Sequence, residues 1–151
     1  MVRIAEESDL VAILELYLDL HEDSVPDDSE NRRQLWSRIL EDKYYNLIIN
    51  EIDGVIVSSC TCIIIPNLTR NLSSYALIEN VVTKKEYEGN GYARACLDYA
   101  EQIAKDSDCY KIMLITGSHD ERTHEFYKSC GYSSDGKTAY VNVLRKVPFK
   151  H

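Results

Sequence analysis

Apolar residues in the first third of the chain recur at helical spacing. Ser8 and Asp9 offer N-cap oxygens to a first helix that is expected to extend to about His21. Its apolar stripe consists of Leu10, Ile13, Leu14, Tyr17 and Leu20. A polar stretch then leads to a second predicted helix, from Ser29 to Asp42, in which Trp36 is expected to lie in the core.

The hydrophobic period then changes to that of strands. The segments from Tyr44 to Asn50 and from Val55 to Ile65 are rich in residues that suit a pleated sheet. Asp53-Gly54 between them predicts a hairpin turn. After a break at Pro66, a third strand is expected from Tyr75 to Thr83. These segments predict three antiparallel strands in series.

Helical and strand patterns alternate in the next part of the chain. A helix is expected from Gly91 to Lys105, followed by an apolar strand from Tyr110 to Thr116. Ser118 and Glu121 have the spacing of a capping box, which predicts the start of a further helix. That helix should end before Gly131, because glycine suits a left-handed C-cap.

The tail from Lys137 to Leu144 alternates enough to predict a final strand or hairpin. With the short apolar start of the chain, the expected order is β-α-α-β-β-β-α-β-α-β, plus one strand if the tail forms a hairpin. This order predicts an α/β fold of the α+β type around a mixed sheet. A chain of 151 residues can bury one sizeable core, so a single domain over residues 1–151 is expected.

Composition and charge narrow the classes of function. Apolar residues make up 44% of the chain and charged residues 28%, as in globular proteins. The formal net charge of -8 opposes binding to nucleic acid and would attract cationic small molecules. The chain starts without an apolar signal region, and no stretch reaches the roughly 18 apolar residues of a membrane span. Secretion and membrane insertion are therefore disfavoured.

The cysteine pattern bears on metal binding and on the cellular compartment. The five cysteines are Cys60, Cys62, Cys96, Cys109 and Cys130. They form no C-x-x-C pair, and no histidine stands at zinc spacing, so no metal site is expected. Their apolar surroundings favour reduced, packed thiols and hence a reducing compartment, which predicts a cytoplasmic protein.

A glycine-containing turn joins the strand that ends near Thr83 to the helix that starts near Gly91. Such a junction directs several unpaired N–H groups and the positive end of a helix dipole at one point, which suits a pyrophosphate. An ordinary tight turn before a helix is the alternative, and two glycines alone do not exclude it. Nucleotide hydrolysis is disfavoured, because Gly89-Asn90-Gly91 lacks the Gly-Lys-Ser/Thr of a phosphate loop.

The loop resembles the acyl-CoA pyrophosphate loop of the GNAT superfamily of N-acetyltransferases, (Gln/Arg)-x-x-Gly-x-(Gly/Ala), with Glu88, Gly91 and Ala93 at its defined positions. Residues 120–132 resemble the second family motif, Asn-x-x-Ala-x-x-Phe-Tyr followed by Gly-(Phe/Tyr). The resemblance implies a GNAT-like fold and acetyl-CoA as co-substrate, without a metal. It also implies direct transfer of an acetyl group to a primary amine in a ternary complex.

Three residues depart from the family pattern. Glu88 stands where the family has Gln or Arg, which brings a carboxylate near the expected phosphates, although the family mainly uses backbone N–H groups there. Asp120 replaces the Asn that touches the cofactor, and Thr123 replaces the small Ala. These departures put the affinity for CoA in question.

Two residues are candidates for acid-base catalysis. Glu79 lies in an otherwise apolar strand, and the resemblance implies that it removes the proton of the amine, directly or through water. Exposure to solvent or a structural ion pair is the alternative for Glu79. Tyr127 matches the tyrosine that many relatives use to protonate the departing thiolate. His119 and His124 flank the second motif and are expected to be bystanders.

The expected cofactor contacts lie on the strand, the loop and the helix starts. Backbone N–H groups of Val81 and Val82 could polarise the acetyl carbonyl if the strand bulges there, as the resemblance implies. The residues expected to bind acetyl-CoA are Val81, Val82, Thr83, Glu88, Gly89, Asn90, Gly91, Tyr92, Ala93, Arg94 and Asp120.

The acceptor is the least defined part of the reaction. In the family the acceptor usually meets the loop between the first two helices, and here Glu22 to Glu30 contains five acids and no base. A cationic small molecule would suit this loop. The alternatives are a peptide amine as the acceptor and a solvated loop that binds no ligand. Dimerisation through C-terminal strands is common in such folds, so a homodimer is considered. An acyl-CoA-binding regulatory module with little transfer activity is the alternative function.

Overall fold

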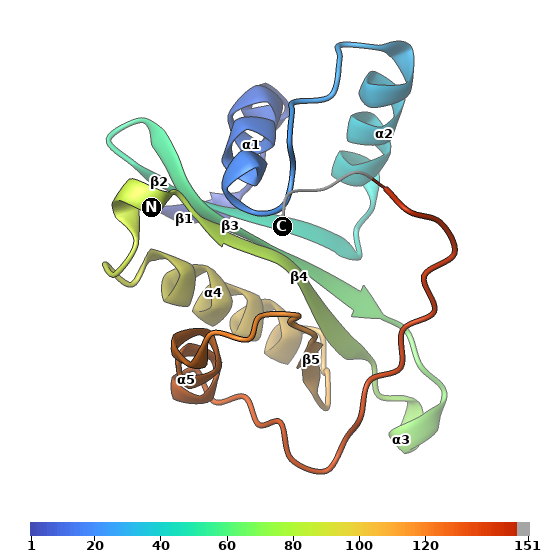
Figure 1. Ribbon diagram of the computed structural model, residues 1–151. Helices are drawn as coiled ribbons and strands as arrows, with labels where there is room; N and C mark the ends of the chain where they lie inside the picture. The colour runs from blue at the N-terminus through green and yellow to red at the C-terminus, as the bar shows by residue number, and fades with distance from the viewer. Residues whose placement is uncertain (148–151) are drawn as a thin grey trace.

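The computed structural model describes residues 1–147 and contains a mixed sheet between two helical layers (Figure 1). Its strands lie in the order β1-β2-β3-β4-β5, with antiparallel neighbours from β1 to β4 and with β5 parallel to β4. The strands are β1 (Val2–Ile4), β2 (Tyr45–Ile52), β3 (Val55–Ile65), β4 (Tyr75–Thr83) and β5 (Ile112–Leu114). The α-helices are α1 (Leu10–Leu16), α2 (Glu30–Glu41), α3 (Thr69–Leu72), α4 (Tyr92–Asp106) and α5 (Glu121–Ser129). This arrangement confirms the predicted fold class.

The two faces of the sheet carry separate cores. Helices α1 and α2 lie on one face, and α4 and α5 lie on the other (Figure 1). Because successive side chains of a strand point to opposite faces, Ile48 packs toward α4 while Leu47 and Ile49 pack toward α1 and α2. Trp36 is buried in the second core, as predicted, and its indole N–H donates to the Glu7 carbonyl oxygen at 3.1 Å.

The first predicted helix is interrupted at both ends. Only α1 is α-helical, and it is flanked by two 3₁₀ turns, η1 (Glu7–Asp9) and η2 (Tyr17–Asp19). Asp9 does not cap α1 with its side chain. Its carboxylate instead accepts the Glu6 N–H at 2.7 Å and pairs with Arg3 at 2.7 Å. Arg3 and the Glu6 N–H therefore bind the carboxylate oxygen atoms of Asp9 that were expected to cap the helix.

The hairpin between β2 and β3 is confirmed. Ile52 pairs with Val55, so Asp53-Gly54 forms a two-residue turn. Both turn residues have positive φ, 49° for Asp53 and 79° for Gly54, as a type I′ turn requires.

The N-terminus of α5 differs from the prediction. Asp120, and not Ser118, is the N-cap, and its carboxylate accepts the Arg122 N–H at 2.9 Å. The Ser118 hydroxyl instead accepts the Asp120 N–H at 3.1 Å, which forms a local turn before the helix. The predicted capping box of Ser118 and Glu121 is therefore wrong.

The C-terminus of α5 follows the prediction. Gly131 has a φ of 96°, and its N–H donates to the Lys128 carbonyl oxygen at 3.0 Å. The Tyr132 N–H donates to the Tyr127 carbonyl oxygen at 3.1 Å. These two bonds form a Schellman motif, in which the third helical residue from the end contacts the residue after the glycine. Here those residues are Tyr127 and Tyr132, whose ring centroids lie 6.3 Å apart.

The predicted final strand is absent from the described residues. No strand follows Leu114 within residues 1–147, and the tail runs outside the sheet toward α2 (Figure 1). Tyr140 is 93% exposed and Leu144 is 90% exposed, so the alternating apolar residues of the tail are not buried against the rest of the described chain. The strand β5 is also shorter than the predicted span from Tyr110 to Thr116.

Candidate active site

The strand β4 contains a bulge. Asn80 and Val81 lie opposite the single residue Cys60 of β3, because Ser59 pairs with Val82 and Thr61 with Glu79. Asn80 has a φ of 53°, a left-handed conformation that asparagine tolerates better than most residues. A bulge bends a strand and increases its twist. The bulge that the family resemblance implied is thus present one residue after Glu79.

Beyond the bulge, one edge of β4 is open. The pairing between β4 and β5 extends only from Ala76 to Ile78 of β4. On the other edge, the Lys84 N–H donates to the Val57 carbonyl oxygen of β3 at 2.8 Å. Alternation along an antiparallel pair therefore directs the Val82 N–H toward β3 and the Thr83 N–H toward the open edge. Backbone donors are available there for a ligand.

The glycine loop presents further backbone donors. Gly89 and Gly91 have φ values of 80° and 79°, which side-chain-bearing residues rarely adopt. Gly91 precedes α4, and no side chain caps this helix. By contrast, Ser29 caps α2 and Asp120 caps α5. The first N–H groups of α4 are consequently free to bind an anion.

Asn90 shapes the loop from within. Its amide donates to the carbonyl oxygen atoms of Tyr87 at 2.9 Å and Glu88 at 3.2 Å. These bonds close the turn that follows the 3₁₀ turn η3 (Lys85–Tyr87). Asn90 was predicted as a cofactor contact, and it does not line the cavity described next.

A cavity of about 830 Å³ lies between the end of β4, the loop, the start of α4 and α5. It brings together most of the predicted cofactor residues and Tyr127. Those residues are Val81, Val82, Thr83, Glu88, Gly89, Gly91, Tyr92, Ala93, Arg94 and Asp120. Four further lining residues were not predicted as contacts, namely Tyr87, Arg122, Thr123 and Phe126.

Tyr127 is held firmly on the cavity wall. Its ring is half-buried and packs against Phe126 at 5.3 Å between centroids, besides its contact with Tyr132. Burial raises the pKa of the Tyr127 phenol, and the neighbouring Cys130 and Cys60 raise the pKa further. The phenol is thus protonated at neutral pH, as a proton donor must be.

The charges at the cavity are balanced. Arg122 donates to the Asp120 carboxylate at 2.9 Å, and this contact lowers the pKa of Asp120. The Asp120 carboxylate raises the pKa of Arg122, and the Glu88 carboxylate adds to this effect. Arg94 lines the same cavity, so two cations accompany the two carboxylates. A basic residue two positions after the N-cap was the sequence feature that could have indicated Arg122.

Glu79 lies apart from the cavity, on the other face of β4. It is exposed and stands directly opposite Thr61 of β3, whose neighbour Leu47 on β2 belongs to the core beneath α1 and α2. Within residues 1–147 the Glu79 carboxylate makes no ion pair. Glu79 and Tyr127 therefore face the bulged strand from opposite sides.

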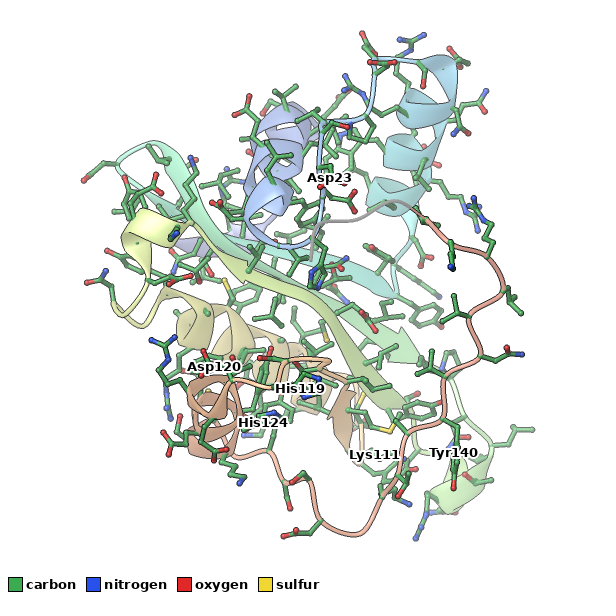
Figure 2. All side chains as sticks on the ribbon, viewed as in Figure 1. Asp23, Lys111, His119, Asp120, His124 and Tyr140 are labelled. Atoms are coloured by element: carbon green, nitrogen blue, oxygen red, sulfur yellow. The ribbon has the colours of Figure 1, made fainter. Side chains whose placement is uncertain are left out.

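The acidic loop between the first two helices is partly neutralised. Asp28 pairs with Arg33 at 2.8 Å and with Arg32 at 3.5 Å, and Glu30 pairs with Arg33 at 3.2 Å. Figure 2 shows Asp23 of this loop on the opposite side of the sheet from Asp120. Two of the five acids are thus engaged by arginine residues of α2.

Residues outside this cavity give weaker indications of a functional site. A ring nitrogen of His124 lies 2.8 Å from the Ser118 carbonyl oxygen, and His119 is exposed near it (Figure 2). Among residues 1–147, no group of three or more His, Cys, Asp or Glu side chains is arranged to hold a metal ion. None of the helices in this part of the chain is long and apolar enough to cross a membrane.

Several known proteins with similar sequences or structures are acetyltransferases. Residues 10–132 match the model of the Acetyltransferase (GNAT) family. The chain is 29% identical over 131 residues to glucosamine 6-phosphate N-acetyltransferase of Trypanosoma brucei brucei, which covers 87% of each protein. A solved structure from Agrobacterium tumefaciens str. C58, assigned to the acetyltransferases, matches 95% of this chain and 99% of its own, with a TM-score of 0.87 and 34% identity. Glucosamine-6-phosphate N-acetyltransferase from Arabidopsis thaliana shares the fold, with a TM-score of 0.80 and 23% identity over 96% of this chain and 98% of its own. The chain therefore belongs to the GNAT acetyltransferase family and is an acyl-CoA acetyltransferase.

Proposed function

We propose that the protein transfers an acetyl group from acetyl-CoA directly to a primary amine while both are bound. The observation that carries this proposal is the arrangement around the bulge of β4. A cavity with free backbone donors and Tyr127 lies on one side of the strand, and Glu79 lies on the other. Donor and acceptor can thus approach the same point from opposite faces without competing for space.

Residues of the cavity fit the donor. The uncapped start of α4 would hold the pyrophosphate through its N–H groups, with Arg94 and Arg122 nearby. Backbone groups of Val81 and Thr83 at the open edge would hold the acyl arm and polarise the acetyl carbonyl. Acetyl-CoA supplies the thioester whose acetyl group is transferred.

Two side chains would move protons. An alkylammonium group with a pKa near 10.4 is almost fully protonated at neutral pH, so the amine must lose a proton before it attacks. The exposed Glu79 carboxylate would accept this proton, directly or through water. The Tyr127 phenol would donate a proton to the departing thiolate, because its raised pKa keeps it protonated.

One relative of this chain suggests a class of acceptor. A curated relative acetylates glucosamine 6-phosphate, as its name states. The acidic loop favours a cationic small molecule, although two of its five acids are already paired. An amino sugar, a polyamine and an amino-terminal peptide are therefore the acceptors to compare.

The test is thiol release from acetyl-CoA in the presence of glucosamine 6-phosphate, glucosamine, spermidine or a short peptide, after CoA binding has been measured by calorimetry. The proposal requires that one amine drives turnover. It also requires that Tyr127→Phe and Glu79→Gln lower kcat while CoA still binds. CoA binding without turnover on any amine would instead favour an acyl-CoA-binding regulatory module, and absence of CoA binding would overturn both functions.

We also propose that the chain forms a homodimer through its tail. The outer edge of β5 has no strand neighbour among the described residues, and a second cavity of about 950 Å³ lies between β5, α5 and the tail. The tail carries four large apolar side chains that are each at least 72% exposed. These side chains are Tyr140, Val141, Val143 and Leu144. Pairing of the tail with β5 of a second copy would cover both surfaces.

Light scattering tests the dimer. The full chain should have twice the monomer mass, and the double substitution Val141→Lys, Val143→Lys should give monomers. Leu68→Lys is the matched control, because Leu68 is 84% exposed at another part of the surface. A monomeric wild-type chain would contradict this proposal.

We propose that the protein is located in the cytoplasm. All five cysteines are free thiols, which supports a reducing compartment.

A further inference from the structure

A row of polar side chains crosses the sheet beneath the first turn of α4. Asn50 of β2 pairs with Ser58 of β3, and Ser58 pairs with Thr83 of β4, so the three side chains lie on one face of the sheet. Asn50 is 3% exposed and Ser58 is fully buried, beside a core of apolar and cysteine side chains. Burial of polar groups costs free energy unless each is paired, so a polar row at this end of the sheet needs a specific explanation.

One end of the row holds the start of α4. The Asn50 amide donates to the carbonyl oxygen of Tyr92 at 3.3 Å. Tyr92 is the first residue of α4 and lines the donor cavity. Asn50 therefore ties the helix start to the sheet, and this contact explains Asn50 but not Ser58.

The Ser58 hydroxyl has two partners on β4. Its Oγ atom lies 2.8 Å from the Val82 carbonyl oxygen and 3.0 Å from Thr83 Oγ1. A hydroxyl group has one hydrogen atom, and a carbonyl oxygen only accepts, so the Ser58 O–H donates to Val82. The Thr83 O–H must then donate to Ser58. Burial raises the pKa of the Cys96 thiol to about 11 despite an opposing effect of Ser58, so no thiolate competes for the Ser58 hydrogen at neutral pH.

This orientation makes the Thr83 hydroxyl an acceptor towards a ligand. Thr83 lines the donor cavity and is only partly buried. Because its hydrogen is directed at Ser58, the remaining lone pair of Oγ1 can accept an N–H but cannot bind a phosphate oxygen, which is itself an acceptor. The Asp120 carboxylate in the same cavity already accepts the backbone N–H and the guanidinium group of Arg122.

We propose that Ser58 is a positioning residue of the donor site, which holds the Thr83 hydroxyl so that Oγ1 accepts an amide N–H of the acyl arm of CoA. This inference rests on the proposed function, because it assigns a contact within that site. Thr83 lies at the open edge of β4, whereas the uncapped start of α4 is the part of the cavity that suits phosphate groups. Without Ser58 the Thr83 hydroxyl could rotate and turn its hydrogen towards the arm, which would oppose the N–H.

The test compares CoA with adenosine 3′,5′-bisphosphate, which has phosphate groups but no acyl arm. Calorimetry measures the Kd of both ligands for each variant, below the Tm of that variant. Thr83→Val should weaken CoA binding about tenfold, the effect of one hydrogen bond, and leave the bisphosphate unchanged. Thr83→Ser keeps the oxygen atom and should restore CoA binding to within about twofold of the wild type.

Ser58→Ala tests the positioning role. It should weaken CoA binding about threefold, and it should have no further effect in a chain that already carries Thr83→Val, because residues that act through one contact are not additive. Ser59→Ala is the matched control. Ser59 is also fully buried and donates to the Ile48 carbonyl oxygen at 2.7 Å, but its side chain points to the opposite face of β3. Ser59→Ala should lower Tm as Ser58→Ala does and leave the Kd for CoA unchanged.

Four results would overturn the inference. They are an unchanged Kd for CoA in Thr83→Val, a parallel loss of bisphosphate binding, additive effects of Ser58→Ala and Thr83→Val, and an equal loss of CoA binding in Ser59→Ala. If these results appear while an amine drives thiol release, the transferase proposal stands alone. The expected binding pattern without thiol release on any amine would support the inference while the transferase proposal fails.

Discussion

The two faces of β4 are built in different ways. On the side of α4 and α5, the candidate donor site consists largely of backbone groups from the bulge, the glycine loop and an uncapped helix. On the side of α1 and η2, the proposed acceptor site has the side chain of Glu79 on β4, which stands opposite Thr61 of β3. Backbone groups suit a ligand shared by a whole family, because they persist while the side chains change.

This difference has a consequence for specificity. The acceptor face lies beneath α1 and α2, whose side chains can change without disturbing the donor site on the other face. The bulge at Asn80 is the one feature that both faces share. Substitutions on the donor side should therefore affect every acceptor alike, substitutions on the acceptor side should change selectivity, and substitutions at the bulge should affect both.

The largest effect is expected on the donor side. Tyr127→Phe removes the proposed proton donor while it keeps the ring in its packing, so kcat should fall about 100-fold for every acceptor while the Kd for CoA stays unchanged. Tyr132→Phe is the matched control, because Tyr132 contacts the same ring. Steady-state kinetics with calorimetry measures both. Equal kcat in wild type and Tyr127→Phe would remove this residue from the mechanism.

The next effect concerns the shared bulge. Asn80→Val places a β-branched residue at a φ of 53°, which costs about 1–2 kcal/mol unless the bulge is lost. Loss of the bulge would shift the register and turn Val81 and Val82 to the opposite faces. We expect kcat/KM to fall at least about tenfold. Asn80→Gly should stay within about twofold, since glycine accepts this φ. Similar kinetics for both variants would show that the bulge is not required.

A third prediction concerns the acceptor side and alkaline pH. The pKa of Tyr17 is raised from about 10 to about 12, so the unfolded chain loses this proton first as the pH rises. Stability from Tyr17 is complete below pH 10 and declines between pH 10 and 12. Between pH 8 and pH 11 the free energy of unfolding should fall by about 1 kcal/mol more in wild type than in Tyr17→Phe. Denaturant titrations measure this difference, and parallel losses in both proteins would contradict it.

Local sequence signals explain which parts of the fold were predictable. The Asp53-Gly54 turn and the Gly131 C-cap act through neighbouring residues, and both formed as expected. The first helix was predicted too long, because the apolar stripe does not show where the chain tightens into 3₁₀ turns. The predicted final strand does not form within residues 1–147, for another reason. Alternation in residues 137–144 indicates a suitable strand but does not supply an edge with which to pair.

The residues of the candidate site also differ in how far the sequence predicts them. Cavity residues on the donor side were predicted from two contiguous motifs. Arg122 was missed although it stands two residues after the N-cap Asp120, which is a local signal. The effect of Glu88 on Arg122 arises only after α5 has packed beside the loop, and no local pattern encodes that packing.

A smaller effect is expected at the glycine loop. Gly91→Ala adds a Cβ that meets no atom within 4 Å, so its cost of about 1 kcal/mol comes from the φ of 79° alone. We expect a shift of the first α4 amides that relieves this strain and weakens CoA binding about fivefold. Gly117→Ala is the control, since Gly117 has open space and no positive φ. Equal CoA affinity for both variants would show that the loop keeps its donors without glycine.

The smallest effect concerns the carboxylate of Glu88, which lines the cavity expected to hold phosphate groups. Glu88→Gln restores the residue type of the family pattern and removes one negative charge near the phosphates. Because Glu88 is exposed, water and salt screen most of its repulsion, so CoA should bind only about two- to threefold tighter at low ionic strength. The gain should disappear near 1 M salt, where the screening length is about 3 Å. Glu86→Gln is the matched control, since Glu86 is exposed in η3 and does not line the cavity. Weaker CoA binding by Glu88→Gln than by the wild type would contradict this prediction. In that case Glu88 would serve chiefly to orient Arg122, and the donor site would depend on side chains more than its backbone geometry indicates.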